Sequence, residues 1–165
     1  FAGMGVSMMA ASQENLDWMR SHLKMQTIGP DKTNQLRHVR FFKDMAGLAA
    51  HMQKHATILK PKFAAVDDIL ERELGGKGVG TWTKPTGGYF VSLDTLDNCA
   101  KEVVAMAGEA GVKMTGAGAT FPYKKDPRDR NIRIAPSLPS LGDIQLAMEG
   151  IAICVQLASV RKLLS

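Results

Sequence analysis

The sequence predicts an α/β fold, in which a short sheet with packed helices follows a long helix. Hydrophobic residues alternate with other residues in segments 89–93 and 131–135, as in strands. They recur every three or four positions in segments 96–110 and 141–155, as in helices. Because strands and helices alternate along residues 76–165, this part of the chain is typical of an α/β sandwich.

The first predicted helix follows an apolar opening. Residues 1–11 are almost all apolar or glycine, as expected of a buried strand or turn. Ser12 fits a helix N-cap, and three apolar residues follow at helical spacing (Leu16, Met19 and Leu23). Gly29-Pro30 ends this helix, and residues 27–43 are predicted to be polar and irregular.

A long helix is predicted from Asp44 to Leu74. Pro61 lies inside it and predicts a bend, because proline removes one backbone donor and crowds the preceding turn. At ~1.5 Å per residue the helix would be roughly 45 Å long, which suits a connection between two domains. We therefore divide the chain into the remnant of a larger domain, a connecting helix and a small C-terminal α/β domain, at residues 1–43, 44–75 and 76–165.

The small domain begins after a glycine-rich loop. The order expected there is strand, helix, short strand, loop and strand, at residues 89–93, 96–110, 112–114, 116–130 and 131–135. Ser140 and Asp143 resemble a capping box with aspartate in the acidic role. The helix that follows has apolar residues at a strict 3-4-3-4 spacing (Leu141, Ile144, Met148, Ile151 and Val155).

The composition is that of a globular protein and argues against several other classes. Of the 165 residues, 45% are hydrophobic and 22% are charged, as in ordinary globular domains. The net charge of +5 comes from scattered basic residues, so we expect no nucleic-acid partner. We also expect no membrane partner, since no apolar run approaches the ~20 residues that span a bilayer. Two cysteines without CxxC spacing favour a reducing compartment, the cytoplasm, and no zinc site.

Three patterns could carry chemistry, and each has a plainer interpretation. His51 and His55 have the i, i+4 spacing of a metal-binding pair, but the glutamate of the zinc-protease motif is absent and a solvated helix face explains them. The glycine pairs at 3–5 and 116–118 could approach a phosphate or simply form turns. Arg133 alternates with two apolar residues on a strand, so it could offer a planar fork to a carboxylate or could face solvent.

The order of several segments resembles that of fold-type I aminotransferases, in their aspartate-aminotransferase-like branch. Residues 131–135 (NIRIA) resemble the family's carboxylate-binding arginine strand, which follows a variable loop and precedes the terminal helix. Residues 81–90 resemble its proline-glycine-glycine-aromatic strand, and residues 111–116 resemble the next strand. Residues 1–6 are similar to the segment just after the cofactor-binding lysine, and residues 28–32 suit the same branch. The resemblance covers essentially the whole chain.

The resemblance implies a cofactor, a substrate anchor and a partner. The cofactor would be pyridoxal 5′-phosphate, and the Schiff-base lysine that holds it is expected upstream of Phe1, so no catalytic residue is assigned in this chain. Arg133 would bind the substrate α-carboxylate, and the backbone at Gly3 and Gly5 could touch the cofactor phosphate, because no arginine appears before Arg20. In many relatives the segment after the first helix reaches across the interface of a homodimer, so Lys32 or Asn34 could contact the active site of the partner subunit.

The leading interpretation is therefore part of an aminotransferase that moves an amino group between an amino acid, with aspartate as a candidate, and a 2-oxo acid. The chain by itself is expected to be inactive, because it lacks the nucleophile. Two alternatives remain open. One is a noncatalytic ligand-binding or regulatory module of aminotransferase fold, and the other is a dimerising structural domain.

Overall fold

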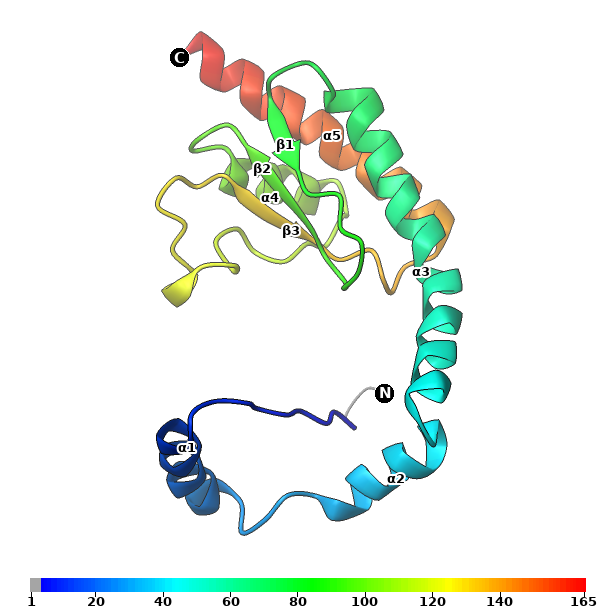
Figure 1. Cartoon of the computed structure of the whole chain (residues 1–165). Helices are drawn as coiled ribbons and strands as arrows, with labels where there is room; N and C mark the ends of the chain where they lie inside the picture. The colour runs from blue at the N-terminus through cyan, green and yellow to red at the C-terminus, as the bar shows by residue number, and fades with distance from the viewer. Residues whose placement is uncertain (1–3) are drawn as a thin grey trace. The chain divides into compact units, whose positions relative to one another are not determined.

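The computed structural model describes residues 4–165, and its contacts divide the chain into two compact units, Phe1–His55 and Ala56–Ser165. Figure 1 traces the helices and strands of both units along the chain. The boundary between the units falls inside the long helix α3 (Met45–Leu74), whose helical conformation continues through Pro61. The roles given above to residues 1–43, 44–75 and 76–165 stay a prediction.

The first unit contains helices α1 (Gln13–Gln26) and α2 (Lys32–Phe42) and the start of α3. Ser12 caps α1 as predicted, since its hydroxyl accepts the Asn15 backbone N–H at 3.4 Å. Helix α1 buries none of its residues fully, and its two half-buried positions, Leu16 and Met19, belong to the predicted apolar face.

Helix α2 corrects the prediction that residues 27–43 are irregular. The Asp31 carboxylate accepts the Asn34 backbone N–H at 2.9 Å, which satisfies an otherwise unpaired donor of the first turn. The stretch between Gly29-Pro30 and Asp44 is thus a separate short helix with its own cap. Its polar composition concealed this, because an exposed helix needs no continuous apolar stripe.

The second unit is a mixed α/β fold built on a small antiparallel sheet, which confirms the predicted fold class. The sheet has the order β1 (Gly80–Trp82), β2 (Val91–Thr95) and β3 (Asn131–Ile134). Helix α4 (Ala100–Glu109), the 3₁₀ turn η1 (Pro122–Lys124) and helix α5 (Leu141–Leu164) complete it, together with the second half of α3.

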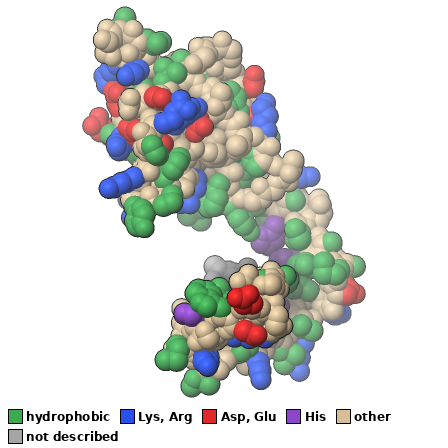
Figure 2. Space-filling view, turned by 60° about the vertical axis from the view of Figure 1, so that its left-hand side comes forward, with side chains coloured by type: hydrophobic (Ala, Val, Ile, Leu, Met, Phe, Trp, Pro, Cys, Tyr) green, Lys and Arg blue, Asp and Glu red, His purple; other side chains and the backbone are tan. Residues whose placement is uncertain are grey.

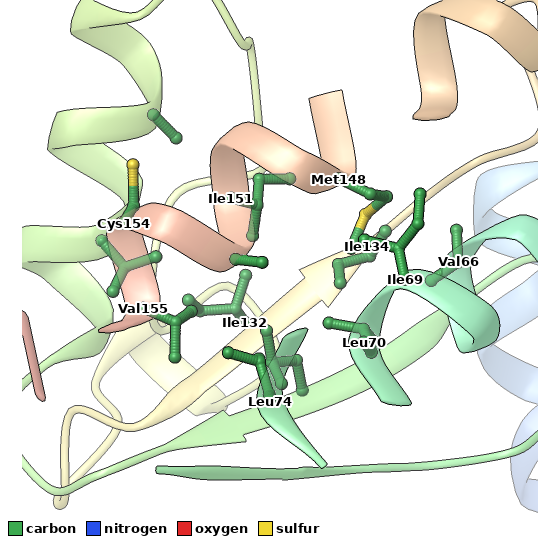
Figure 3. Close-up of a cluster of buried hydrophobic side chains, with 14 of the residues drawn as sticks. Val66, Ile69, Leu70, Leu74, Ile132, Ile134, Met148, Ile151, Cys154 and Val155 are labelled. Atoms are coloured by element: carbon green, nitrogen blue, oxygen red, sulfur yellow. The ribbon is translucent and has the colours of Figure 1, made fainter. Parts of the chain in front are cut away.

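Side chains of α3, β3 and α5 meet in the part of the core that Figure 3 draws, and residues of β2 and α4 complete the buried cluster. The buried positions of α5 include Ile144, Met148, Ile151 and Val155, as the 3-4-3-4 spacing predicts. On β3, Ile132 and Ile134 point into the same core and are 1% and 6% exposed. Burial of apolar surface is the dominant favourable term in folding, so these contacts fix β3 against its helices.

The strand expected at residues 112–114 is not found. That segment is irregular in the structure, although Val112 and Met114 still pack against the core. A strand is defined by hydrogen bonds to a neighbouring strand, and the sheet formed by the described residues contains only β1, β2 and β3.

Helix α5 is apolar on more than one side. Over its most apolar window the mean hydropathy is 1.3, and by length and composition it meets the requirements of a membrane span, contrary to the expectation from apolar runs. It also buries eight residues in the protein core, and core helices of globular domains meet the same requirements. The expected absence of a membrane partner stays a prediction.

Candidate functional site

The sheet has an apolar face and a polar face, and Arg133 lies on the polar one. Its neighbours Ile132 and Ile134 enter the core, and successive side chains of a strand point to opposite faces. In the antiparallel register Arg133 lies directly opposite Ser92 of β2. Short-range alternation on a rigid strand therefore places this guanidinium away from the core, as predicted.

The carboxylate of Asp94, on this polar face, takes part in a network of hydrogen bonds and ion pairs. The Asn131 amide donates to Ser92 Oγ at 2.8 Å and to Asp94 Oδ1 at 2.7 Å. Arg130 lies beside the same carboxylate, with Nη2 at 3.5 Å from Asp94 Oδ2. Asp94 is thus paired with the side chains of Asn131 and Arg130, which both precede Arg133 in sequence.

Arg133 itself has no anionic partner among residues 4–165. Its Nε is buried without a hydrogen-bond partner, and none of the ion pairs in this part of the chain includes it. Within the described part of the chain, its guanidinium contacts Phe90, whose ring centroid lies 4.6 Å from Cζ. A buried donor without a partner is rare in proteins and calls for a ligand or another physical explanation.

Side chains at both ends fix the strand that carries Arg133. Before it, Asp126 Oδ2 accepts the backbone N–H groups of Arg130 at 2.8 Å and Asn131 at 2.9 Å. Burial opposes ionisation of Asp126, but the backbone hydrogen bonds from residues 128–131 together outweigh it and lower the pKa of the carboxyl below its ordinary value. After the strand, Lys62 Nζ donates to the carbonyl oxygens of Ser137 at 2.9 Å and Pro139 at 2.5 Å.

An open, mainly apolar groove of about 790 Å³ adjoins this strand. Its lining includes Met114, Arg133, Ile134, Leu146 and Ile153, all within the second unit. Ligand sites in proteins typically combine apolar walls with few polar groups. The groove therefore brings the predicted anchor and a concave apolar surface together.

The other predicted contact residues lie in the first unit. Gly3 lies outside the described residues. The Gly5 carbonyl accepts the Asn34 amide at 3.2 Å, and a Cβ at Gly5 would meet no atom within 4 Å. These observations do not test a contact with a cofactor phosphate, and the role of Gly5 stays a prediction.

Lys32 and Asn34, the two residues predicted to contact a partner's site, differ in their exposure to solvent. Lys32 is exposed at the start of α2. Asn34 is buried at 9% exposure and its amide donates to the carbonyls of Met4 and Gly5, both at 3.2 Å. Its donors are used within its own unit. Both partner contacts stay predictions.

The histidine pair and the two cysteines show no arrangement typical of a metal site or a reactive thiol within the described residues. The rings of His51 and His55 lie 4.6 Å apart, and no group of three or more metal-ligating side chains occurs between residues 4 and 165. Cys99 and Cys154 are buried, and burial raises the pKa of both thiols, which disfavours the nucleophilic thiolate.

Sequence reasoning missed the residues around Arg133. Phe90, Asp94 and Asn131 share its face of the sheet, and the alternation along each strand would have indicated this. The pairing of β2 with β3, which brings residues about 40 positions apart together, was not visible in the sequence.

Acidic and basic side chains are interspersed over the visible face of the molecule (Figure 2). Exposed ion pairs of the second unit include Arg161 with Glu102 at 2.7 Å and Arg128 with Asp97 at 3.0 Å. A mixed charge distribution of this kind produces no large field of one sign.

Comparison with known proteins places the chain in a family. The family model described as aspartate amino-transferase matches residues 1–165. An aspartate aminotransferase from Corynebacterium glutamicum is 48% identical over 158 residues, which are 96% of this chain and 37% of that protein. A Mycolicibacterium smegmatis protein, named provisionally as an aminotransferase, is 52% identical over 99% of this chain and 38% of its own length.

Solved structures agree in fold. The crystal structure of an aspartate transaminase from Corynebacterium glutamicum superposes with a TM-score of 0.84 at 46% identity, over 92% of this chain and 36% of that one. An α-aminoadipate aminotransferase from Thermus thermophilus has the same fold at 18% identity, with a TM-score of 0.72 over 90% of this chain and 37% of that one. The chain spans less than two fifths of the length of these relatives, and it belongs to the aspartate aminotransferase family.

Proposed function

We propose that this chain is the C-terminal portion of a pyridoxal-phosphate-dependent aminotransferase, and that Arg133 binds the α-carboxylate of its substrate. The observation that carries the proposal is the guanidinium of Arg133, which lies beside a groove and has no anionic partner in the described chain. Its neighbour Arg130, by contrast, lies 3.5 Å from Asp94 and 3.8 Å from Asp97. The Nε of each arginine is buried without a hydrogen-bond partner, so what distinguishes Arg133 is that no carboxylate of residues 4–165 forms an ion pair with it.

The chemistry of the anchor follows from its geometry. Guanidinium donors form two parallel, charge-assisted hydrogen bonds to a carboxylate, which fix orientation as well as position. The core on one side of β3 and the contacts of Asp126 and Lys62 at its ends hold the backbone that carries the anchor in a defined position. Arg133 would thus hold the substrate so that its Cα–H bond faces the reacting centre.

The cofactor is proposed for the longer protein rather than assigned to residues of this chain. Pyridoxal phosphate supplies an electron sink when bound. The Thermus thermophilus relative was solved with N-(5′-phosphopyridoxyl)-L-leucine, which supports this cofactor. No lysine of this chain is given the cofactor-binding role.

We further propose that the amino donor is aspartate or a similar amino acid, since two relatives carry the name aspartate aminotransferase or transaminase. The longer protein would act as a cytoplasmic homodimer. Light scattering tests the dimer, and an active enzyme that is monomeric would contradict it. Cell fractionation tests the cytoplasmic location.

Substitution of the anchor in the longer protein tests the central proposal. Arg133→Met removes two charge-assisted hydrogen bonds, each worth at least about 1.5 kcal/mol. A loss of about 3 kcal/mol corresponds to a fall in kcat/KM of roughly 150-fold. Arg130→Met is the matched control, because that arginine is already paired with acids, and it should change kcat/KM far less. If both variants lose activity equally, or neither does, Arg133 is not the anchor.

A further inference from the structure

The polar face of the sheet places one aromatic ring within reach of the proposed anchor. Phe90 immediately precedes β2, and alternation puts it on the same face as Ser92. Arg133 lies opposite Ser92, so Phe90 is its diagonal neighbour on the adjacent strand. Diagonal neighbours are close enough for aromatic and long side chains to touch.

The guanidinium contacts this ring and not the acid on the other diagonal. Cζ of Arg133 lies 4.6 Å from the centroid of the Phe90 ring, which is cation–π distance. Asp94, two residues beyond Ser92, is paired instead with Asn131 and Arg130. Arg133 is therefore held by an aromatic face and not by a carboxylate.

These two kinds of support differ in what they leave available. A carboxylate partner would use the N–H donors that point outward in the plane of the guanidinium. A guanidinium that stacks on an aromatic ring leaves those donors free, and Cζ of Arg133 lies over the Phe90 ring. We infer that Phe90 is a positioning residue, which fixes the guanidinium plane of Arg133 while keeping its donors free for the substrate carboxylate. This inference rests on the role proposed above for Arg133.

The test compares three variants of the longer enzyme. Phe90→Leu removes the ring, Phe90→Tyr keeps it, and Tyr89→Leu removes a neighbouring aromatic side chain of similar exposure, 55% against 47% for Phe90. An exposed cation–π contact corresponds to roughly a two- to fivefold effect on an equilibrium. We expect Phe90→Leu to raise KM for the amino acid by that factor with kcat nearly unchanged, because the anchor binds ground and transition states alike. Phe90→Tyr and Tyr89→Leu should stay near the wild-type values.

A second readout needs neither cofactor nor activity. In the 165-residue chain, the side-chain N–H signal of Arg133 should carry an upfield ring-current shift in the NMR spectrum. Phe90→Leu should abolish that shift, whereas Tyr89→Leu should preserve it. An unchanged signal in Phe90→Leu, or an equal rise of KM in Tyr89→Leu, overturns the inference.

The two proposals fail in distinguishable ways. If Arg133→Met abolishes substrate binding and Phe90→Leu leaves KM unchanged, Arg133 is the anchor and Phe90 does not position it. If Arg133→Met leaves kcat/KM unchanged, the anchor role itself is wrong, whatever the NMR signal of Arg133 shows.

Discussion

Placing a carboxylate directly opposite Arg133 should block the proposed anchor and at the same time stabilise the fold. Ser92 faces Arg133 in the register of β2 and β3, and directly opposed side chains have Cβ atoms about 5 Å apart. In Ser92→Asp the new carboxylate would pair with the guanidinium. An incoming substrate would then compete with an internal anion for the same donors.

The expected magnitude follows from charge separation and exposure. Two unit charges about 5 Å apart interact by roughly 3 kcal/mol at an effective dielectric constant of about 20, and by about 0.8 kcal/mol in bulk water. Because the polar face of the sheet is partly exposed, we take about 1 kcal/mol, which corresponds to about a fivefold rise in KM. The free energy of unfolding should rise by up to the same amount, within the range of cross-strand charge pairs.

The matched control is Ser92→Asn, because asparagine has nearly the same shape as aspartate and a similar strand propensity but carries no charge. Steady-state kinetics of the longer enzyme and urea unfolding of the 165-residue chain measure the two effects. The difference between the Asp and Asn variants isolates the charge. If Ser92→Asp and Ser92→Asn share one KM, the substrate does not bind at Arg133.

Two further predictions concern the stability of the 165-residue chain. Leu70→Ala should lower its free energy of unfolding by about 2–5 kcal/mol, because the Leu70 side chain of α3 is fully buried. Leu146→Ala, at a 72% exposed position, should cost little. Equal losses in urea unfolding would contradict the assigned core. Asp126 has a lowered pKa in the folded chain, so its contribution is present above the unfolded pKa and is lost as pH falls through the folded one. The stability gap between wild type and Asp126→Asn should therefore be constant near neutral pH and shrink below about pH 4, and a gap that widens on acidification would refute this.

Local patterns were sufficient for the elements whose neighbours are close in sequence. Ser140 accepts the Asp143 backbone N–H at 3.2 Å, as the capping pattern predicted, and the 3-4-3-4 spacing identified the buried side of α5. The same holds for Arg133, because alternation with Ile132 and Ile134 depends only on strand geometry. The cap, the buried side of the helix and the face of Arg133 each depend on the local backbone conformation and on the spacing of apolar residues. Both can be recognised from a few consecutive residues.

Features that depend on distant partners could not be obtained in this way. Helix α2 was missed because its capping residue lies in a polar segment without a clear apolar stripe, and residues 112–114 were assigned to a strand that has no pairing partner among the described residues. The availability of Arg133 is a feature of the same kind. It depends on Asn131 and Arg130 occupying Asp94, which lies 37 positions before Asn131.

The sequence alone determined the family resemblance, the α/β class and the residue that faces away from the core on the last strand, because these follow from local periodicity and the order of segments. Only the tertiary structure decided whether that residue is free to bind an anion. Which charged side chains pair with each other depends on which residues meet across neighbouring strands. That in turn depends on the register of β2 and β3, since a shift of one residue would turn every side chain to the opposite face.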